Sequence, residues 1–458
     1  MLYRINLVFA TLAVAVLGYA IPVAGQNAQD RPATNHVVLI SIDGFAAYHL
    51  ENEKLELPNI RELIANGVRA ESSRTVFPSV THPSHATLIT GVSPRAHGVL
   101  GNEMTNRETG TSFSATTQTR KDAVHVPTLF DAAHKAGLKT AGFCWPETRG
   151  DASLNFNILH GHGELNRTEV DAKLLQRLRE AGIPIDAYYD IAPRGGMVQG
   201  FRDFILAQSA AEIFRTEKPN LMAVHFLVTD GMQHSFGSAH YLAHAALTQT
   251  DYHVGMIVQA VKEAGLEDET TFVIVADHGF HSVNHEVNIH PVLAASGLGG
   301  KVRLHGSGWN VFLETTDAFS AKRDGKELES FFKEVLKLEG VHRVIRNNEY
   351  NAIGYPRYED SPYVMGQYMI IPEIDTYLVV DSKSTSTVRR ERSPSHTHGY
   401  LPEHPRMYPA LVLSGHGIKR GHRIGSVRNQ DIAPTIADIL KLSMTNVEGR
   451  VLVEAFDK

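Results

Sequence analysis

Cysteine is almost absent from this chain of 458 residues, in which Cys144 is the only one. A single thiol excludes an internal disulfide, so the fold must be stabilised by its core and by any metal ions it binds. A surplus of positive charge is also missing, since the formal net charge is −6. Without that surplus the chain lacks the electrostatic footprint of a nucleic-acid-binding protein, and no polymer of this kind is expected as a partner.

Length and composition leave room for a large core. With 43% hydrophobic residues over 458 positions, the chain can bury an extensive interior. Internal repeats and low-complexity tracts are lacking. We therefore expect either one large α/β domain with an insertion or two closely joined domains.

The first 25 residues have the layout of a secretory signal peptide. Arg4 precedes an apolar run over residues 5–21, and small residues at 22–25 come before a polar stretch. The alternative is an uncleaved membrane anchor, because the run is near the lower length limit for spanning a bilayer. We expect export to the periplasm or outside the cell, with no stable membrane span after cleavage.

Three apolar runs end in an aspartate. They cover residues 37–43, 221–230 and 271–277, and they end in Asp43, Asp230 and Asp277. Continuous β-branched runs are typical of strands buried on both faces of a parallel sheet, where ligands bind at the carboxyl ends. One aspartate at a strand end is more often a helix cap. Three together, two of them with nearby histidines, favour a binding site at one rim of the sheet.

The accompanying histidines indicate a metal. His234 lies four residues after Asp230, His278 follows Asp277 directly, and residues 395–400 supply His398. Sets that mix carboxylate oxygens with imidazole nitrogens suit zinc better than calcium or magnesium, which prefer oxygen ligands only. The sequence therefore predicts zinc at this rim.

Residues 77–85 place a hydroxyl at the start of a helix. Thr81 comes two residues before Pro83, which fits a first helical turn, and the helix is expected to continue to Gly91. One interpretation makes Thr81 an N-cap whose hydroxyl accepts from the helix amides. The other makes it a nucleophile, because the free amides at a helix N-terminus also hold phosphate.

A family resemblance rests on motifs that follow one another in a fixed order. They are Asp43-Gly44-Phe45, Phe77-Pro78 with Thr81 and Pro83, Gly98 through Asn102, Asp230 with His234, Asp277-His278-Gly279, and Thr397-His398-Gly399-Tyr400. Together they resemble the nucleotide pyrophosphatase/phosphodiesterase (type I phosphodiesterase) family of the alkaline phosphatase superfamily. The resemblance implies an α/β fold with a mostly parallel, alkaline-phosphatase-like central sheet flanked by helices and a small α+β cap insertion.

The resemblance also implies a site with two zinc ions. One ion is held by Asp230, His234 and His398, and the other by Asp43, Asp277, His278 and the Thr81 oxygen. Asn102 matches the family asparagine that, with the Thr81 amide, contacts a non-bridging phosphoryl oxygen.

The implied function is zinc-dependent hydrolysis of phosphodiester or pyrophosphate bonds in a small-molecule phosphate ester, through a phospho-threonine intermediate. A phosphomonoesterase or phosphonate hydrolase could use the same two-zinc site. A non-catalytic zinc-stabilised binding protein is disfavoured, because it has no need of Thr81 and Asn102. The leaving group and the oligomeric state stay open.

The sequence departs from the family pattern in two places. His82 and Ser84 stand where many relatives have Phe and Asn, and residues 145–149 read Trp-Pro-Glu-Thr-Arg in place of the common Trp-Pro-Gly. Arg149 is a candidate substrate-binding residue, because an arginine fork on terminal phosphate oxygens would favour monoesters. Its alternative role is that of a solvated loop arginine.

The expected organisation has four parts: a signal peptide at 1–25, a first part of the catalytic domain at 36–290, a cap insertion at 291–394 and a last catalytic part at 395–458. Among the local predictions are a helix ending with a glycine cap at Gly67, a single strand over 302–314 and a loop over 381–394.

Overall fold

The computed structural model describes residues 36–192, 196–387 and 390–457. The signal peptide predicted at 1–25 lies outside these ranges, so the periplasmic or secreted location stays a prediction. Within the described ranges, none of the helices combines the length and the apolar character needed to cross a membrane.

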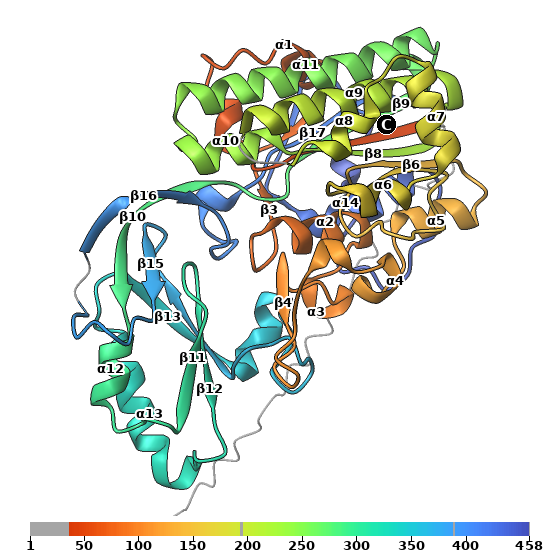
Figure 1. Cartoon of the computed structure of the whole chain (residues 1–458). Coiled ribbons are helices and arrows are strands. Elements are labelled where there is room, and N and C mark those ends of the chain that lie inside the picture. The colour runs from red at the N-terminus through yellow and green to blue at the C-terminus, as the bar shows by residue number, and fades with distance from the viewer. Residues whose placement is uncertain (1–35, 193–195, 388–389, 458) are drawn as a thin grey trace, which may run out of the picture. The chain divides into compact units, whose positions relative to one another are not determined.

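An eight-stranded sheet in the order β18-β2-β17-β9-β1-β8-β6-β7 forms the centre of the fold (Figure 1). Its strands are β1 (His36–Ile42), β2 (Gly67–Ala70), β6 (Thr140–Phe143), β7 (Phe156–Ile158), β8 (Leu221–Phe226), β9 (Thr270–Val275), β17 (Leu411–Gly415) and β18 (His422–Ile424). All neighbours pair in parallel except β17, which is antiparallel to both β9 and β2. The predicted α/β class with a mostly parallel sheet is confirmed.

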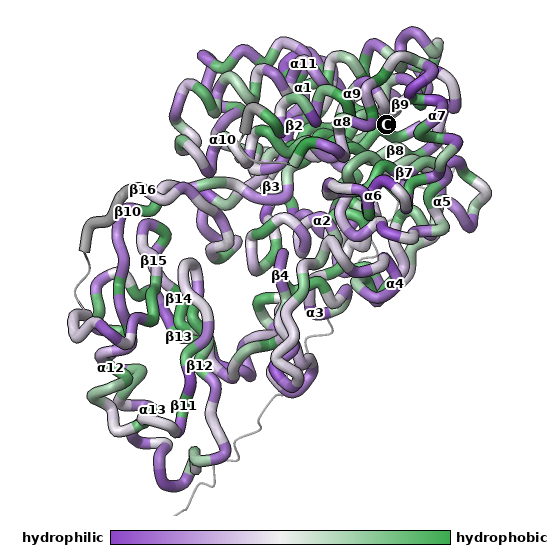
Figure 2. Tube along the Cα trace, in the orientation of Figure 1, coloured by the Kyte–Doolittle hydropathy of each residue, from purple (hydrophilic) through white to green (hydrophobic). Residues whose placement is uncertain are grey.

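The three central strands are buried along their whole length, as their apolar runs predict. In β1, Val37 lies opposite Leu221 of β8 and Thr271 of β9. Figure 2 shows hydrophobic residues along these strands and hydrophilic ones on the outer turns of the helices. Burial on both faces explains why the strands do not alternate between polar and apolar residues.

Helices cover both faces of the sheet (Figure 1). On one face, α1 (Pro58–Ala65), α9 (Gly196–Glu217) and α11 (Tyr241–Glu263) pack around Val38 and Ile40. On the other face, α2 (Thr81–Thr90), α5 (Leu129–Lys135) and α14 (Ile432–Ile439) pack around Val37 and Leu39. Alternate residues of one strand thus belong to two separate cores.

The predicted glycine cap at Gly67 is wrong. Helix α1 ends at Ala65 with Asn66 as its C-cap, and Gly67 begins strand β2. A Cβ on Gly67 would lie 2.2 Å from the Leu413 carbonyl oxygen of β17. Glycine is needed here because two strands approach closely, which local sequence does not reveal.

The region expected as a cap insertion contains an antiparallel sheet in the order β11-β12-β14-β13. Its elements are β11 (Val302–His305), β12 (Val311–Thr315), β13 (Val341–Arg346) and β14 (Tyr368–Pro372), with α12 (His290–Ala295) and α13 (Ala321–Val335) packed against them. The single strand predicted over 302–314 is instead a hairpin, turned at Gly306 and Gly308, both of which have positive φ. The boundaries at 291 and 394 stay predictions.

A second small sheet, β15-β10-β16, consists of β10 (His281–Asn288), β15 (Thr376–Val379) and β16 (Arg390–Thr397). The loop predicted over 381–394 is therefore wrong from residue 390 onward, where β16 pairs with β10. The remaining elements are β3 (Ser73–Arg74), β4 (Glu103–Thr105), β5 (Ser112–Ser114), β19 (Val427–Arg428), α3 (Pro94–His97), α4 (Arg120–Ala123), α6 (Glu164–Thr168), α7 (Ala172–Glu180), α8 (Ile185–Asp190) and α10 (Val228–Phe236).

Candidate active site

Two of the three predicted aspartates follow their strands directly, and the third does not. Asp43 comes after β1 and Asp277 after β9, but β8 ends at Phe226 and Asp230 lies in the first turn of α10. The helix begins there because Asp203 accepts hydrogen bonds from the backbone N–H groups of Leu227 and Val228, both at 2.8 Å. Asp230 and His234 are then one helical turn apart and share a face.

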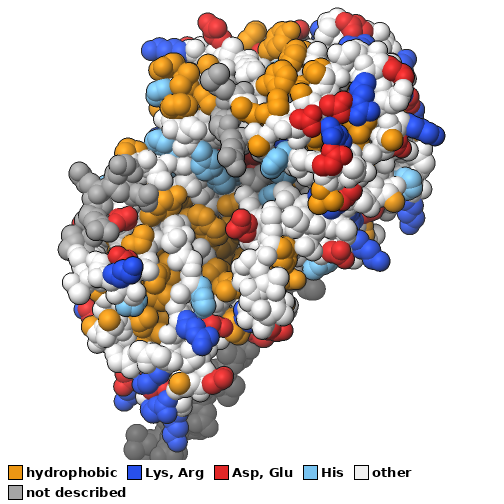
Figure 3. Space-filling model, in the orientation of Figure 1, with side chains coloured by type: hydrophobic (Ala, Val, Ile, Leu, Met, Phe, Trp, Pro, Cys, Tyr) orange, Lys and Arg blue, Asp and Glu red, His pale blue; other side chains and the backbone are white. Residues whose placement is uncertain are grey.

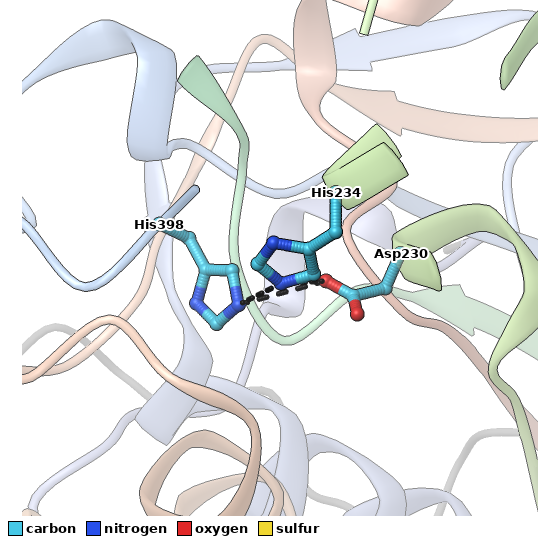
Figure 4. A group of neighbouring side chains, drawn as sticks. All are labelled: Asp230, His234 and His398. Atoms are coloured by element: carbon cyan, nitrogen blue, oxygen red, sulfur yellow. Dashed lines mark hydrogen bonds and ion pairs between the residues drawn. The ribbon is translucent and has the colours of Figure 1, made fainter. Parts of the chain in front are cut away.

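Two groups of side chains could each hold a metal ion. One consists of Asp230, His234 and His398, the other of Asp43, Asp277 and His278, and within each group the potential ligand atoms lie within 4.8 Å of one another. The structure therefore brings together the same two sets of aspartate and histidine side chains that the family resemblance implies. Figure 4 shows His234 and Asp230 of α10 pointing toward His398, which comes from the segment after β16.

Backbone hydrogen bonds orient all three histidines. Nδ1 of His234 lies 2.8 Å from the His396 carbonyl, Nδ1 of His398 lies 3.0 Å from the Ser79 carbonyl, and Nδ1 of His278 lies 3.0 Å from the Gly279 carbonyl. Because a carbonyl oxygen only accepts, each Nδ1 carries a proton, which leaves Nε2 as the nitrogen that can bind a metal. This arrangement is the usual one for a metal-binding histidine.

In the first group the Nε2 atoms face one another. Nε2 of His234 lies 3.2 Å from Nε2 of His398, and Asp230 Oδ1 is 3.4 and 3.5 Å from the two nitrogens. These three atoms are close enough to bind one metal ion together. Burial and the neighbouring histidines hold the pKa of His398 well below its usual value, so its ring stays neutral and able to bind a metal.

In the second group three buried atoms have no hydrogen-bond partner among the described residues: Asp43 Oδ1, Asp277 Oδ2 and His278 Nε2. His278 Nε2 is 3.4 Å from Asp43 Oδ1 and 3.1 Å from Asp277 Oδ2. Burial, together with the charges of Asp277 and Asp230, raises the pKa of Asp43 well above its usual value. Buried carboxylates this close are costly unless a cation neutralises them, so both groups fit a bound metal ion.

Thr81 is the first residue of helix α2, and Val80 takes the N-cap position without a side-chain hydrogen bond. The N-cap interpretation of Thr81 is therefore wrong. The residue is 8% exposed. His85 fixes the turn, since its Nδ1 donates to the Thr81 carbonyl at 2.8 Å and its Nε2 accepts from the Ser41 hydroxyl at 2.9 Å.

Asn102 is tied to the same helix end. Its Oδ1 accepts a hydrogen bond of 3.0 Å from the backbone N–H of His82. This bond fixes which end of the amide faces the helix, so the NH₂ group remains available as a donor. Asn102 also lines a cavity of about 820 Å³, whose walls include His234 and His398.

Arg149 has partners of its own. Its guanidinium donates to the carboxylate of Glu169, the side chain of Asn166 and the carbonyl of Thr116. Its side chain is 12% exposed, so the solvated-loop alternative does not describe it. Among the described residues, no recorded contact joins it to either metal group, and its role in substrate binding stays a prediction.

Sequence reasoning missed two residues next to the site. Nε2 of His225 lies 3.1 Å from Asp43 Oδ2, and its Nδ1 lies 3.2 Å from the Cys144 carbonyl. Glu147 pairs with the ring of His82, and both side chains are buried. A histidine inside the apolar run of β8 was a visible signal, because a buried polar side chain needs a polar partner.

Comparison with known proteins agrees with this geometry. A model of the family described as type I phosphodiesterase / nucleotide pyrophosphatase matches residues 37–401. The chain therefore belongs to this family, whose members are hydrolases of the alkaline phosphatase superfamily.

The curated relatives are distant in sequence and longer. The chain is 20% identical to the venom phosphodiesterase of Naja atra over 420 residues, which are 89% of this chain and 44% of that protein. It is 23% identical to ectonucleotide pyrophosphatase/phosphodiesterase family member 3 of Mus musculus over 246 residues, 53% of this chain and 24% of that protein. The chain thus spans less than half the length of these relatives.

Solved structures share the fold. Human ectonucleotide pyrophosphatase/phosphodiesterase 5 superposes with a TM-score of 0.68 at 16% identity, covering 92% of this chain and 100% of that one. An inactive form of the murine protein, solved in complex with AMP, gives a TM-score of 0.67 at 16% identity with the same coverage. At this identity the likeness shows the fold alone.

Proposed function

We propose that this chain is a two-zinc phosphodiesterase that hydrolyses small phosphodiester or pyrophosphate substrates, with Thr81 as its nucleophile. The observation that carries the proposal is that residues of both metal groups contact the turn that contains Thr81, the first group directly and the second through His85. His398 of the first group donates to the Ser79 carbonyl just before Thr81. His85, which donates to the Thr81 carbonyl, has the same nitrogen 3.8 Å from Asp277 Oδ2 of the second group.

Zinc is the metal that these ligands favour. One group offers one carboxylate and two imidazoles, the other two carboxylates and one imidazole. Mixed oxygen and nitrogen ligands in groups of three suit zinc, whereas calcium and magnesium take oxygen. When bound, the two ions would lower the pKa of the Thr81 hydroxyl and offset the negative charge of the phosphoryl group.

The reaction takes place in two displacements. Thr81 Oγ bonds to phosphorus and loses its proton to solvent, while the bond from phosphorus to the leaving oxygen breaks and that oxygen takes a proton from water. Water then attacks the phospho-threonine, the bond from phosphorus to Oγ breaks, and Thr81 regains its proton. In sum, one diester and one water give one phosphomonoester and one alcohol.

Asn102 and the backbone amide of Thr81 position the phosphoryl group. The amide lies in the first turn of α2, where helix N–H groups have no partner within the helix. The Asn102 NH₂ group is free to donate because its oxygen is held by His82. Donors fixed before the substrate arrives stabilise charge on the equatorial oxygens at no reorganisation cost.

The test compares wild type, Thr81→Ser and Thr81→Ala, each loaded with zinc, on a chromogenic phosphodiester and its matching monoester. We expect wild type to prefer the diester, Thr81→Ser to keep turnover, and Thr81→Ala to lose at least about 10⁴-fold in kcat. Metal analysis should find two zinc ions per chain in all three. Undiminished turnover by Thr81→Ala would exclude the covalent route. A preference for the monoester would mean that the enzyme is a phosphatase, and Arg149 would then be the first residue to test for binding the monoester phosphate.

A further inference from the structure

The cavity beside the metal groups is lined by residues of the Asp230 group and by none of the Asp43 group. Its walls include His234 and His398, together with Asn102, but no residue of the buried Asp43 group. In an in-line displacement the leaving group departs on the side opposite the nucleophile. If Thr81 acts with the buried group, as the proposed function states, the group that departs lies in this cavity.

Aromatic side chains form one wall of the cavity and are held in place by the nucleophile segment. Trp309 and Tyr355 both make edge-to-face contacts with Phe77, four residues before Thr81, with ring centroids 5.8 Å apart in each case. Trp309 also packs so tightly on Gly399 that a Cβ there would lie 2.5 Å from its ring. This wall is therefore already formed around the site before any substrate binds.

The other side chains around the cavity are largely apolar or neutral. Tyr363, Met365 and Leu100 add apolar surface, and on the face drawn in Figure 3 hydrophobic side chains gather in a hollow with histidines beside it. Among the described residues that line the cavity, none is a lysine or an arginine, and Glu103 brings a carboxylate. Apart from the ion that His234 and His398 would hold at one end of the cavity, these walls offer no charge partner to a phosphate or carboxylate on the departing group.

One buried donor lines the same space. Asn310 is 5% exposed, and its Nδ2 has no hydrogen-bond partner among the described residues. An unpaired buried amide is costly, and a neutral acceptor on a ligand, such as an ether or ester oxygen, would satisfy it.

We propose that the leaving group of the natural substrate is an uncharged, largely apolar alcohol that fills this cavity between His398 and the Trp309 wall. The inference rests on the proposed function and narrows its substrates to one class. These are phosphodiesters of neutral apolar alcohols, and not pyrophosphates or nucleotides whose departing group is charged.

The first experiment uses methyl phosphodiesters of 2-nitrophenols that carry a 4-alkyl chain from methyl to butyl. The leaving-group pKa is nearly constant along the series, so only apolar size changes. We expect kcat/KM to rise about fourfold per methylene, the factor that corresponds to about 0.8 kcal/mol per buried CH₂. A flat series with an active enzyme would overturn the proposal.

The effect of charge is tested with three 4-substituents on the same 2-nitrophenyl diesters: tert-butyl, trimethylammonium and carboxylate. Each kcat/KM is divided by the rate constant of the hydroxide-catalysed reaction of the same diester, which corrects for differences in leaving-group reactivity. The expected order places tert-butyl first by about tenfold, since apolar walls desolvate a charged group at a cost. A preference for trimethylammonium would assign a cationic alcohol, and a preference for carboxylate an anionic one. Either result contradicts the proposal.

Matched variants locate the effect. Tyr363→Ser removes part of the wall and should flatten the alkyl series, whereas Tyr358→Ser, a tyrosine of the same segment that does not line the cavity, should leave it unchanged. Glu103→Gln should weaken discrimination against the carboxylate substrate, with Glu108→Gln in the turn of the same hairpin as its control. If no diester is turned over although both zinc ions are bound, the proposed function fails; if turnover depends on Thr81 but ignores chain length, only this inference fails.

Discussion

The two metal groups consist of the same residue types but differ in their exposure to solvent. The side chains of Asp43, Asp277 and His278 are at most 3% exposed, whereas His234 is 41% and Asp230 18% exposed. The buried group lies at the ends of β1 and β9 in the middle of the sheet, and the other is formed by α10 and the segment after β16. One group is thus part of the core, and the other is part of the cavity wall.

This difference in solvent exposure matches two different requirements of a two-metal site. In the proposed mechanism, the ion beside the nucleophile has to be held rigidly, because a small displacement of a reacting atom is costly in rate. The site of the other ion has to admit substrates and release products. We expect the buried group to exchange its ion slowly and the exposed group to exchange it quickly.

The largest effect is expected from aspartate-to-asparagine changes in the two groups. Asp277→Asn keeps the acceptor for the N–H groups of Gly44 and His278 but puts an NH₂ where Oδ2 has no partner. An amide nitrogen does not bind zinc, so kcat/KM should fall by roughly 10³-fold or more. Asp230→Asn should cause a comparable loss without added metal, and zinc analysis with turnover measurements checks both.

Excess zinc then distinguishes the groups. Turnover by Asp230→Asn should recover in excess zinc, because that group is open to solvent, whereas Asp277→Asn should stay inactive. Equal recovery in both variants would mean that burial does not control metal exchange, and the contrast between the groups would fail.

A smaller effect is expected from His225→Gln. His225 lies against Asp43 Oδ2 and holds that carboxylate in place for the buried group. Loss of such a positioning residue typically weakens metal affinity by about 10- to 100-fold. Competition with a chromogenic chelator should show weaker binding of one ion per chain and an unchanged second ion.

The control for this variant is His253→Gln, another buried histidine, whose ring packs on Phe204 and Phe226. It should leave both affinities unchanged. Weakening of the exposed group by His225→Gln would show that the two groups are not independent.

The smallest expected effect is on the pH dependence of the free energy of unfolding and does not involve the metal groups. Burial lowers the pKa of His97 to about 3, and its Nδ1 accepts from the Val99 N–H at 3.2 Å. Between pH 6.5 and 3 the unfolded chain binds a proton at this residue and the folded chain does not, so the free energy of unfolding falls as pH falls. The slope from this group is up to about 1.4 kcal/mol per pH unit.

His97→Gln should therefore make the decline of stability below pH 6.5 shallower. Denaturant titrations of the zinc-free proteins at pH 5 and pH 7 measure it, since no recorded contact joins His97 to either metal group within the described ranges. An identical slope in wild type and variant would mean that His97 is protonated in the folded state.

The sequence predicts much of the site because its residues follow from local pattern. Apolar runs that end in aspartate place β1 and β9 correctly, and the spacing of Asp230 and His234 gives the shared helical face. The strand predicted to run to Asp230 was too long, since an apolar run alone does not tell a buried strand from the first turn of a helix. Asp203 decides the matter through hydrogen bonds across 24 residues of chain.

Other features depend on tertiary contacts that no local pattern contains. The lack of room for a side chain at Gly67 comes from Leu413, and the aromatic wall depends on contacts of Trp309 and Tyr355 with Phe77, far away in the chain. The side-chain hydrogen-bond partners of Arg149 lie in two other segments, at Thr116 and at residues 166–169, so its environment could not be inferred from charge alone.

Strand β17 has a consequence for incomplete chains. It is the only strand that links β2 to β9 in the described sheet, and it is formed from residues 411–415, after every residue of the two candidate metal groups has been synthesised. A chain that stops before Leu411 contains both candidate metal groups and Thr81 yet leaves β2 and β9 with unpaired edges. Rows of free backbone groups on apolar strands are templates for pairing between molecules, so premature termination favours aggregation as well as loss of activity.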